Sequence, residues 1–210
     1  MNLHLRRFTA ILFDFDGVIA DTEPQYDLFF GRLAEEYQLG KNFAGRIKGI
    51  TLATVMEKHF YNYPPAEQTK ITESLRRYER EMTYTFIPGA REAIARFRAG
   101  GYKIAVVTSS PNEKMAIALQ KMQLENAFDA LITADKITRG KPDPMCYLLA
   151  ASALCVPPQE CVVFEDSIAG ITAGITAGMK VIALATTLPA DTLAQYTDTV
   201  IPDFLALGEE

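Results

Sequence analysis

Cysteine is scarce in this 210-residue chain, and its three cysteines are Cys146, Cys155 and Cys161. An odd number of cysteines in apolar surroundings suits neither a disulfide framework nor a zinc site, so we expect buried thiols in a reducing, cytoplasmic compartment. Basic residues are outnumbered as well: 21 Lys and Arg face 26 Asp and Glu, which gives a net charge of −5. Without a Lys/Arg-rich stripe, this balance argues against a nucleic-acid partner.

Long apolar runs and nucleotide-binding patterns are missing too. No stretch approaches the roughly 20 apolar residues of a membrane span, so we expect no membrane partner. Arg6 and Arg7 precede a short apolar run in the manner of a secretory signal, but Asp14 and Asp16 interrupt that run and no small-residue cleavage site precedes them. Neither GxGxxG nor GxxxxGK[ST] occurs, which excludes the sequence signatures of dinucleotide-binding folds and P-loop proteins.

The chain is organised around residues 9–22, TAILFDFDGVIADT. The apolar run Ala10–Phe13 predicts a buried strand, which ends in the carboxylates of Asp14 and Asp16, with Gly17 allowing a sharp turn. Buried carboxylates need a cation, a hydrogen-bond cage or protonation, and Mg²⁺ accepts such hard oxygen ligands. One carboxylate could then attack a substrate while the other moves protons, although a DxDG at a strand end is often only a solvated turn.

A calcium-binding EF-hand is a poorer explanation of the same stretch. That loop needs further oxygen ligands at regular spacing and a bidentate glutamate at its end. Here the apolar residues Val18 and Ile19 follow instead.

The remainder of the chain changes its pattern twice. Residues 23–85 show helical spacing without a convincing strand, which predicts an all-helical cap domain inserted after the first strand. Residues 1–22 and 86–210 form the predicted core domain, where strands alternate with helices as in a doubly wound parallel α/β sheet. The further strands are expected at Lys103–Val107, Ala130–Thr133, Cys161–Phe164, Val181–Leu184 and Thr199–Ile201. A four-residue repeat places Gly170, Gly174 and Gly178 on one helix stripe, which we interpret as close packing on the sheet.

Polar residues gather where these strands stop. Ligands of open parallel sheets bind beyond the carboxyl ends of the strands. Each residue also has a structural explanation: Thr108 could cap a helix, Lys141 could lie in a surface turn, and the acidic pair could cap a helix. Their joint occurrence favours a site in which a hydroxyl and an ammonium hold phosphate oxygens and carboxylates hold Mg²⁺. The set is Asp14, Asp16, Thr108, Lys141, Glu165 and Asp166.

Four segments in this order, DFDGV, VVTSS, GKPDP and VVFEDS, resemble the motifs of the haloacid dehalogenase superfamily. The resemblance covers essentially the whole chain. It extends to the subgroup with a small helical cap, through DGVIADTEP and EDSIAGITAGITAGM. That branch contains phosphoglycolate phosphatases, sugar-phosphate phosphatases and β-phosphoglucomutases, and its core has the Rossmann-like fold.

The resemblance implies a role for each strand-end residue. Asp14 would be the nucleophile that becomes an aspartyl phosphate, and Asp16 would protonate the leaving alcohol and then activate water. Thr108, Lys141 and the Ser109 amide would hold the phosphoryl oxygens. The Mg²⁺ ligands would be Asp14, the Asp16 carbonyl, Asp166 and Glu165, the last directly or through water.

The expected function is therefore a Mg²⁺-dependent phosphatase for a small phosphorylated metabolite of the sugar phosphate or phosphoglycolate type. The alternative is a β-phosphoglucomutase. In the mutase pattern, a cap arginine that helps hold a second phosphate falls at Leu52, a histidine at Tyr26 and a basic residue at Pro111. Ser110 and Asn112 do match, so a second anion site stays open, but the missing basic contacts favour the phosphatase.

We expect residues around the cap to select the substrate. Lys48 would also be available as the Schiff-base lysine of a phosphonate hydrolase, but no other feature of the sequence supports that activity. For Arg76 and Arg77, ordinary surface charge is an equally good explanation. The candidates are Thr22, Lys48, Thr51, Arg76, Ser110 and Asn112.

Two other functional classes fit the sequence less well than an enzyme. A phosphorylation-dependent signalling domain fits the inserted cap and the late acidic pair less well, and a catalytically dead binding relative fits poorly with the full set of reactive residues. We expect a monomer, with a dimer as the alternative.

Overall fold

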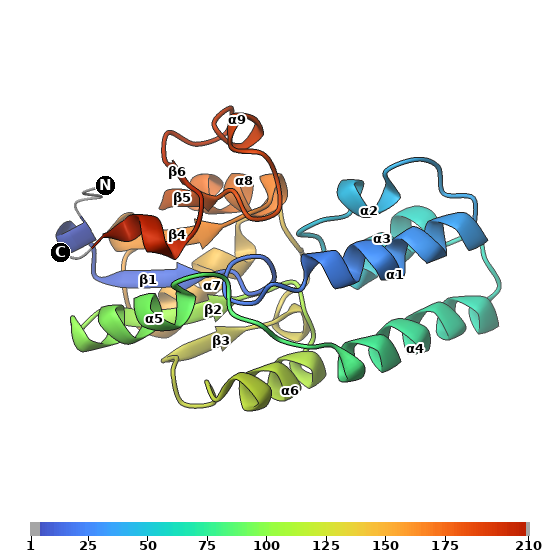
Figure 1. Ribbon diagram of the computed structural model, residues 1–210, viewed down its shortest axis with the longest axis horizontal. Coiled ribbons are helices and arrows are strands. Elements are labelled where there is room, and N and C mark those ends of the chain that lie inside the picture. The colour runs from blue at the N-terminus through green and yellow to red at the C-terminus, as the bar shows by residue number, and fades with distance from the viewer. Residues whose placement is uncertain (1–4, 209–210) are drawn as a thin grey trace.

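The computed structural model describes residues 5–208 and contains a six-stranded sheet in which every neighbouring pair of strands is parallel (Figure 1). The strand order is β3-β2-β1-β4-β5-β6, so the chain builds outward from β1 first to one side and then to the other. This order confirms the predicted doubly wound sheet. The strands are β1 Ala10–Phe13, β2 Lys103–Val107, β3 Ala130–Ile132, β4 Cys161–Glu165, β5 Lys180–Leu184 and β6 Val200–Ile201.

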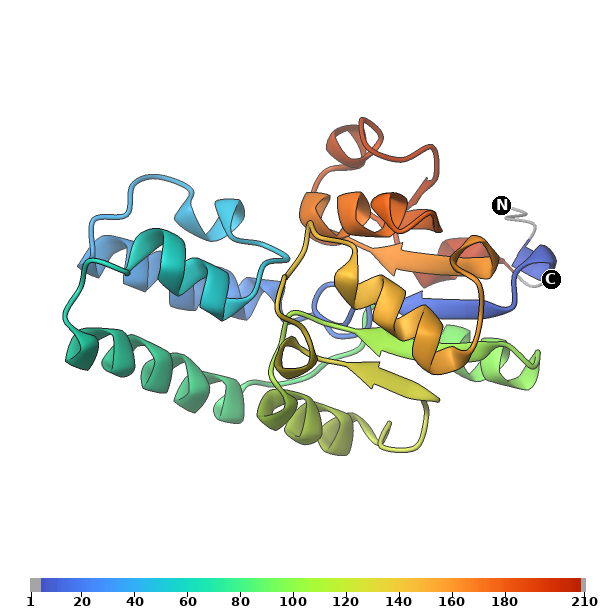
Figure 2. The same ribbon diagram turned by 180° about the vertical axis from the view of Figure 1, so that it is seen from behind.

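Helices cover both faces of this sheet. Because side chains alternate along a strand, Ile11 and Phe13 of β1 enter one apolar cluster, whereas Ala10 and Leu12 enter another. The first cluster lies under α5 (Ala90–Ala99) and α6 (Asn112–Met122), and the second under α7 (Met145–Leu154) and α8 (Ile168–Thr176). Figures 1 and 2 show α5 and α7 on opposite faces. The short α9 (Ala190–Leu193) and the 3-10 segments Leu5–Arg7, Ala134–Lys136, Pro158–Glu160 and Phe204–Leu207 complete this part.

A helical cap is inserted between β1 and α5. It contains α1 (Glu23–Glu36), α2 (Phe43–Arg46), α3 (Leu52–His59) and α4 (Pro65–Glu81), around a small apolar cluster of its own. The strand arrows in both views point toward these helices, so the cap lies beyond the carboxyl ends of the strands (Figures 1 and 2). The expected inserted cap is thus present, while its treatment as a separate domain with boundaries at residues 23 and 85 stays a prediction. No helix within residues 5–208 has the length and apolar character needed to cross a membrane.

Some local expectations were wrong. Cys155 is exposed rather than buried, because it adopts a left-handed conformation (φ 53°) at the end of α7, where the chain turns at the surface. Gly178 lies beyond the end of α8 with φ 78° and does not extend the glycine stripe of that helix. Gly174 does pack closely, since a Cβ there would lie 2.8 Å from the Val181 side chain. The short helices α2 and α9 were not expected.

Phe13 offers a direct test of the core. Its ring is fully buried and stacks on Phe164 at a centroid distance of 5.5 Å, with Phe97 at 6.1 Å. We expect Phe13→Ala to lower the free energy of unfolding by about 3–5 kcal/mol, measured by urea denaturation, because it removes a large side chain and leaves a cavity. Leu28→Ala, at a side chain that is 61% exposed, is the control and should change stability by no more than about 0.5 kcal/mol. Equal effects of the two variants would contradict this description of the core.

Candidate active site

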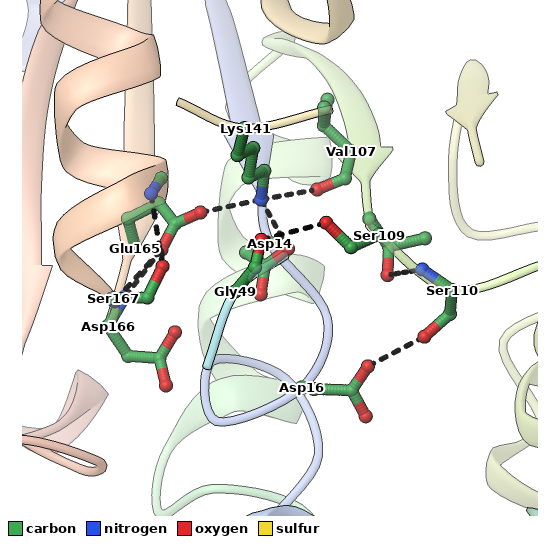
Figure 3. Close-up of polar contacts among 12 residues, drawn as sticks. Asp14, Asp16, Gly49, Val107, Ser109, Ser110, Lys141, Glu165, Asp166 and Ser167 are labelled. Carbon is green, nitrogen blue, oxygen red and sulfur yellow. Dashed lines mark hydrogen bonds and ion pairs between the residues drawn. The ribbon is translucent and has the colours of Figure 1, made fainter. Parts of the chain in front are cut away.

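The site is built at the carboxyl edge of the central strands. Asp14 directly follows β1, and its backbone N–H donates to the Phe164 carbonyl (3.0 Å), which keeps the residue in line with the sheet. Because β1 lies between β2 and β4, the residues that follow those strands, Thr108 and Asp166, flank it. The expected strand-end residues therefore meet in space, as Figure 3 shows for Asp14, Lys141, Glu165 and Asp166.

Lys141 is buried between two carboxylates. Its Nζ donates to Asp14 Oδ1 (2.7 Å), to Glu165 Oε1 (2.6 Å) and to the Val107 carbonyl (3.3 Å) (Figure 3). Desolvation acts to lower the pKa of Lys141, but the charges of Asp14 and Glu165 outweigh it and hold that pKa well above its ordinary value. Lys141 therefore remains an ammonium and is not the surface lysine that its loop position allowed.

Glu165 is fully occupied by protein donors. Besides Lys141, its Oε1 accepts from the Tyr147 hydroxyl (3.0 Å), and its Oε2 accepts from the backbone N–H groups of Asp166 (2.9 Å) and Ser167 (3.0 Å). Desolvation would raise the pKa of Glu165, but Lys141 outweighs it and keeps the pKa below its ordinary value. Gly170 makes room for this carboxylate, because a Cβ there would lie 1.6 Å from Glu165 Oε1. Glu165 thus anchors Lys141.

Asp14, Glu165 and Asp166 form a compact acidic group. One carboxylate oxygen from each lies within 4.8 Å of the others, and all three residues are buried. Among the described residues, Lys141 is the only cation in a salt bridge with this group. Three buried carboxylates and one ammonium leave an excess of negative charge, which a divalent cation would offset. The donor set therefore fits Mg²⁺, with Asp14 and Asp166 better placed as ligands than the fully paired Glu165.

Burial raises the pKa values of both Asp14 and Asp166. Burial raises the pKa of Asp14 to about 7, against the opposing charge of Lys141. Burial also raises the pKa of Asp166 well above its ordinary value, and repulsion from Glu165 and Asp14 adds to the shift. Asp166 Oδ2 accepts a hydrogen bond from the Thr187 hydroxyl. Gly17, with φ 75°, lets the first turn approach Asp166, since a Cβ there would lie 2.0 Å from that same oxygen.

Asp16 lies two residues from Asp14 but has different partners. Its Oδ1 accepts from the Thr22 hydroxyl (2.6 Å), and its Oδ2 accepts from the Ser110 hydroxyl (2.9 Å). The Nζ of Lys114 donates to both oxygens, at 2.5 and 2.6 Å. Lys114 was missed in the sequence, although it lies four residues after Ser110, a spacing that brings side chains together near a helix start.

The TSS segment after β2 joins the core to the cap. Thr108 Oγ1 accepts from the Ser110 N–H (3.0 Å), so Thr108 shapes its own loop and does not cap α6. The Ser109 hydroxyl donates to the carbonyl of Gly49 in the cap (2.9 Å), and Figure 3 shows this contact next to Asp14. Gly49 also packs on Ser167, because a Cβ added to Gly49 would lie 2.3 Å from the Ser167 hydroxyl oxygen. The cap therefore touches the core directly over the site.

A cavity of about 500 Å³ lies between cap and core. Its lining includes Asp14, Asp16, Thr108, Ser109 and Asp166, whereas Lys141 lies behind the wall. Four of the six selection candidates also line it, namely Lys48, Thr51, Arg76 and Ser110.

The remaining two candidates, Thr22 and Asn112, lie outside this lining and bond to protein: Asn112 Oδ1 accepts from Thr133 (2.8 Å). Any part that they play in selection would be indirect. Thr51 has a structural task as the N-cap of α3, where it accepts from the Thr54 N–H (3.3 Å).

Comparison with known proteins gives a consistent result. A family model described as haloacid dehalogenase-like hydrolase matches residues 11–184. The phosphorylated carbohydrates phosphatase of Thermotoga maritima is 34% identical over 187 residues, covering 81% of this chain and 82% of that protein. Hexitol phosphatase B of Escherichia coli is 31% identical over 189 residues, covering 85% and 84%. A β-phosphoglucomutase structure from Clostridium difficile aligns with a TM-score of 0.80 at 25% identity, covering 96% of this chain and 93% of that one.

The raised carboxyl pKa values predict how metal binding depends on pH. Because the unfolded chain releases the Asp14 proton at about pH 4 and the metal-free fold only at about 7, metal-free stability should fall as pH rises across this interval. A metal must displace that proton below pH 7 but not above it. We therefore expect Mg²⁺ to raise the melting temperature more at pH 8 than at pH 6, measured by scanning fluorimetry.

The matched control is Asp14→Asn, which removes the competing proton together with a charged ligand. It should show a smaller rise with Mg²⁺ at pH 8 and a weaker difference between the two pH values. An equal rise at pH 6 and pH 8 in the unmodified protein would contradict the assignment of Asp14 as a ligand.

Proposed function

Because the chain belongs to the haloacid dehalogenase-like hydrolases, we propose that it is a Mg²⁺-dependent phosphatase that acts on a sugar or sugar-alcohol monophosphate through an aspartyl phosphate. The observation that carries the proposal is the separation of the two aspartates at the end of β1. Both aspartates line the cavity, but Asp14 is bonded to Lys141 within the buried acidic group, whereas Asp16 is held by two hydroxyls and by Lys114. Two carboxylates in such different surroundings suit a nucleophile and an acid/base group.

In the first half of the proposed reaction, a carboxylate oxygen of Asp14 attacks the phosphorus and the bond to the sugar oxygen breaks. Asp16 gives its proton to the departing alkoxide, which leaves as an alcohol. In the second half, Asp16 takes a proton from water, the water oxygen attacks the phosphorus, and inorganic phosphate leaves as the Asp14 carboxylate is regenerated. Each proton that Asp16 gives is thus recovered from water.

The other strand-end residues support the transferred group. Thr108 and the Ser109 N–H would hold phosphoryl oxygens, since both residues line the cavity, and Lys141 would offset the repulsion between the Asp14 carboxylate and the phosphate. Asp14, the Asp16 carbonyl and Asp166 would hold Mg²⁺, with Glu165 acting behind them. When bound, the metal supplies positive charge to the phosphoryl oxygens. The cap contact through Gly49 limits the access of bulk water.

The charges of the cavity point to the kind of leaving group. Lys48 and Arg76 are the basic side chains among the described residues of the lining, and both are paired. Lys48 contacts Glu23 (2.7 Å) and Asp27 (3.0 Å), and Arg76 contacts Glu73 (2.9 Å). With these cations neutralised, a neutral polyhydroxyl group fits better than a second anion. The names of the two phosphatases similar to this chain, which refer to phosphorylated carbohydrates and hexitols, agree with this choice over phosphoglycolate.

A β-phosphoglucomutase is the second candidate, favoured by the likeness to the mutase structure and by the position of Ser110 on the cavity wall. A mutase must hold a second phosphate during its cycle. Leu52, which takes the place of the mutase arginine, lines the cavity and provides no charge. The phosphatase therefore remains the better proposal.

Phosphate release from a panel of monophosphates tests the proposed activity. We expect metal-dependent release, with hexitol and hexose monophosphates ahead of phosphoglycolate. Asp14→Asn should abolish it, and Asp16→Asn should lower kcat roughly 10²- to 10⁴-fold, because it removes the acid/base group but keeps the nucleophile. Isomerisation of β-glucose 1-phosphate without net phosphate release would establish the mutase instead, and full turnover by the Asp14 variant would reject both.

Leu52 tests the argument about the missing cation. Leu52→Arg should raise kcat/KM for phosphoglycolate relative to sorbitol 6-phosphate by roughly tenfold, because an added cation favours the substrate with a second negative charge. Leu52→Gln is the matched control, with a polar side chain and no charge. If both variants shift the ratio equally, charge is not what selects the substrate.

A further inference from the structure

Lys114, on α6, is a buried charged residue to which the proposed reaction assigns no part. Its side chain is completely shielded from solvent, and its Nζ lies 2.5 and 2.6 Å from the two oxygens of Asp16. The same Nζ donates to the Ser110 hydroxyl at 2.8 Å. Ser110 in turn donates to Asp16. The lysine thus binds Asp16 directly and also fixes a second donor to it.

The surroundings of Lys114 prevent contact with a substrate. Aromatic rings of Tyr26 and Phe15 lie 4.8 and 5.7 Å from Nζ. The ammonium has three protons, and its contacts with Asp16 and Ser110 use its donor capacity. Lys114 is also absent from the cavity lining, whereas Asp16 is part of it. Any influence on the reaction therefore passes through neighbours on the cavity wall. Lys114 donates two hydrogen bonds to Asp16 and one to Ser110, while its charge only acts to lower the pKa of Glu79.

The charges near Asp16 explain why a cation is placed there. Glu23 and Glu79 line the same cavity, and the Asp16 charge contributes to raising the pKa of each, after the larger effect of burial. The other lysines near the cavity are committed elsewhere, Lys48 to Glu23 and Asp27, and Lys141 to Asp14 and Glu165. Lys114 is thus the cation in contact with Asp16 among the described residues.

We propose that Lys114 is a positioning residue that sets the orientation of the Asp16 carboxylate for proton transfer. Thr22 and Ser110 contact one oxygen each, whereas Lys114 contacts both and so limits rotation of the carboxylate. A general acid or base must lie within hydrogen-bond reach of the proton it transfers, and a displacement of about 1 Å costs roughly 10²-fold in rate. The inference rests on the proposed role of Asp16.

A double-mutant cycle tests this role. Lys114→Met keeps the length of the side chain but removes its charge and its donors. We expect it to lower kcat for sorbitol 6-phosphate roughly 10- to 100-fold with KM within about twofold, because substrate contacts are unchanged. In an Asp16→Asn background the same substitution should change kcat by less than about threefold, since there is no longer an acid/base group to position.

Lys121→Met is the matched control on the same helix. Lys121 Nζ donates to the carbonyls of Arg80 (3.1 Å) and Met82 (3.0 Å), so it joins the core to the end of the cap without reaching Asp16. This variant should keep kcat within about twofold of the unmodified protein. Melting temperatures of all variants distinguish unfolding from a loss of catalysis. If Lys114→Met does not fold, Lys114→Gln, which is smaller and uncharged, replaces it.

The outcomes separate the two proposals. If Asp16→Asn retains full kcat, the acid/base role of Asp16 fails, and the role of Lys114 fails with it. If Asp16→Asn slows turnover but Lys114→Met causes the same fold-loss in both backgrounds, or none in either, only the inference about Lys114 is overturned. The inference is supported if Lys114→Met causes a large loss of kcat when Asp16 is intact and little change in the Asp16→Asn background.

Discussion

The ion pairs of Lys141 with Asp14 and Glu165 are the interactions on which the site depends. Three carboxylates are buried at the strand ends. The desolvation free energy of buried charges exceeds the attraction within an isolated ion pair unless further hydrogen bonds reach the remaining oxygens. The fold meets this requirement from several elements: Tyr147 on α7, the N–H groups before α8, and Gly170, which has no side chain to obstruct Glu165. The catalytic edge is therefore held by the packing of two helices.

Much of this edge follows from the sequence because its signals are local. Apolar runs locate all six strands within a residue at each end, and polar residues directly after them must meet once the strands are parallel. Lys114 could not be assigned in this way, because its partner Asp16 lies 98 positions earlier. The exposure of Cys155 was likewise hidden, since it depends on a left-handed turn at a helix end and not on the apolar residues around it.

The cap was predicted as helices, yet its relation to the site depends on contacts that no periodicity reveals. The Ser109 hydroxyl and the Gly49 carbonyl join core to cap, and Gly49 packs against Ser167 without a side chain between them. A residue expected to serve the phosphate through its backbone thus also holds the cap through its hydroxyl. The contact with the cap and the proposed contact with phosphate consequently share one short segment after β2.

The distribution of lysines explains how an acidic protein can handle an anionic substrate selectively. Lys48, Lys114 and Lys141 each lie beside carboxylates, and none of them is a free positive charge in the cavity. At the strand ends, however, three carboxylates face one lysine and fit a divalent cation, which would supply positive charge to a phosphate there. Near Lys48 two carboxylates face one ammonium, so this part of the cavity has no net attraction for a second anion. In the proposed reaction, one end of the cavity would therefore bind the phosphoryl group electrostatically, while the other end suits hydroxyl groups.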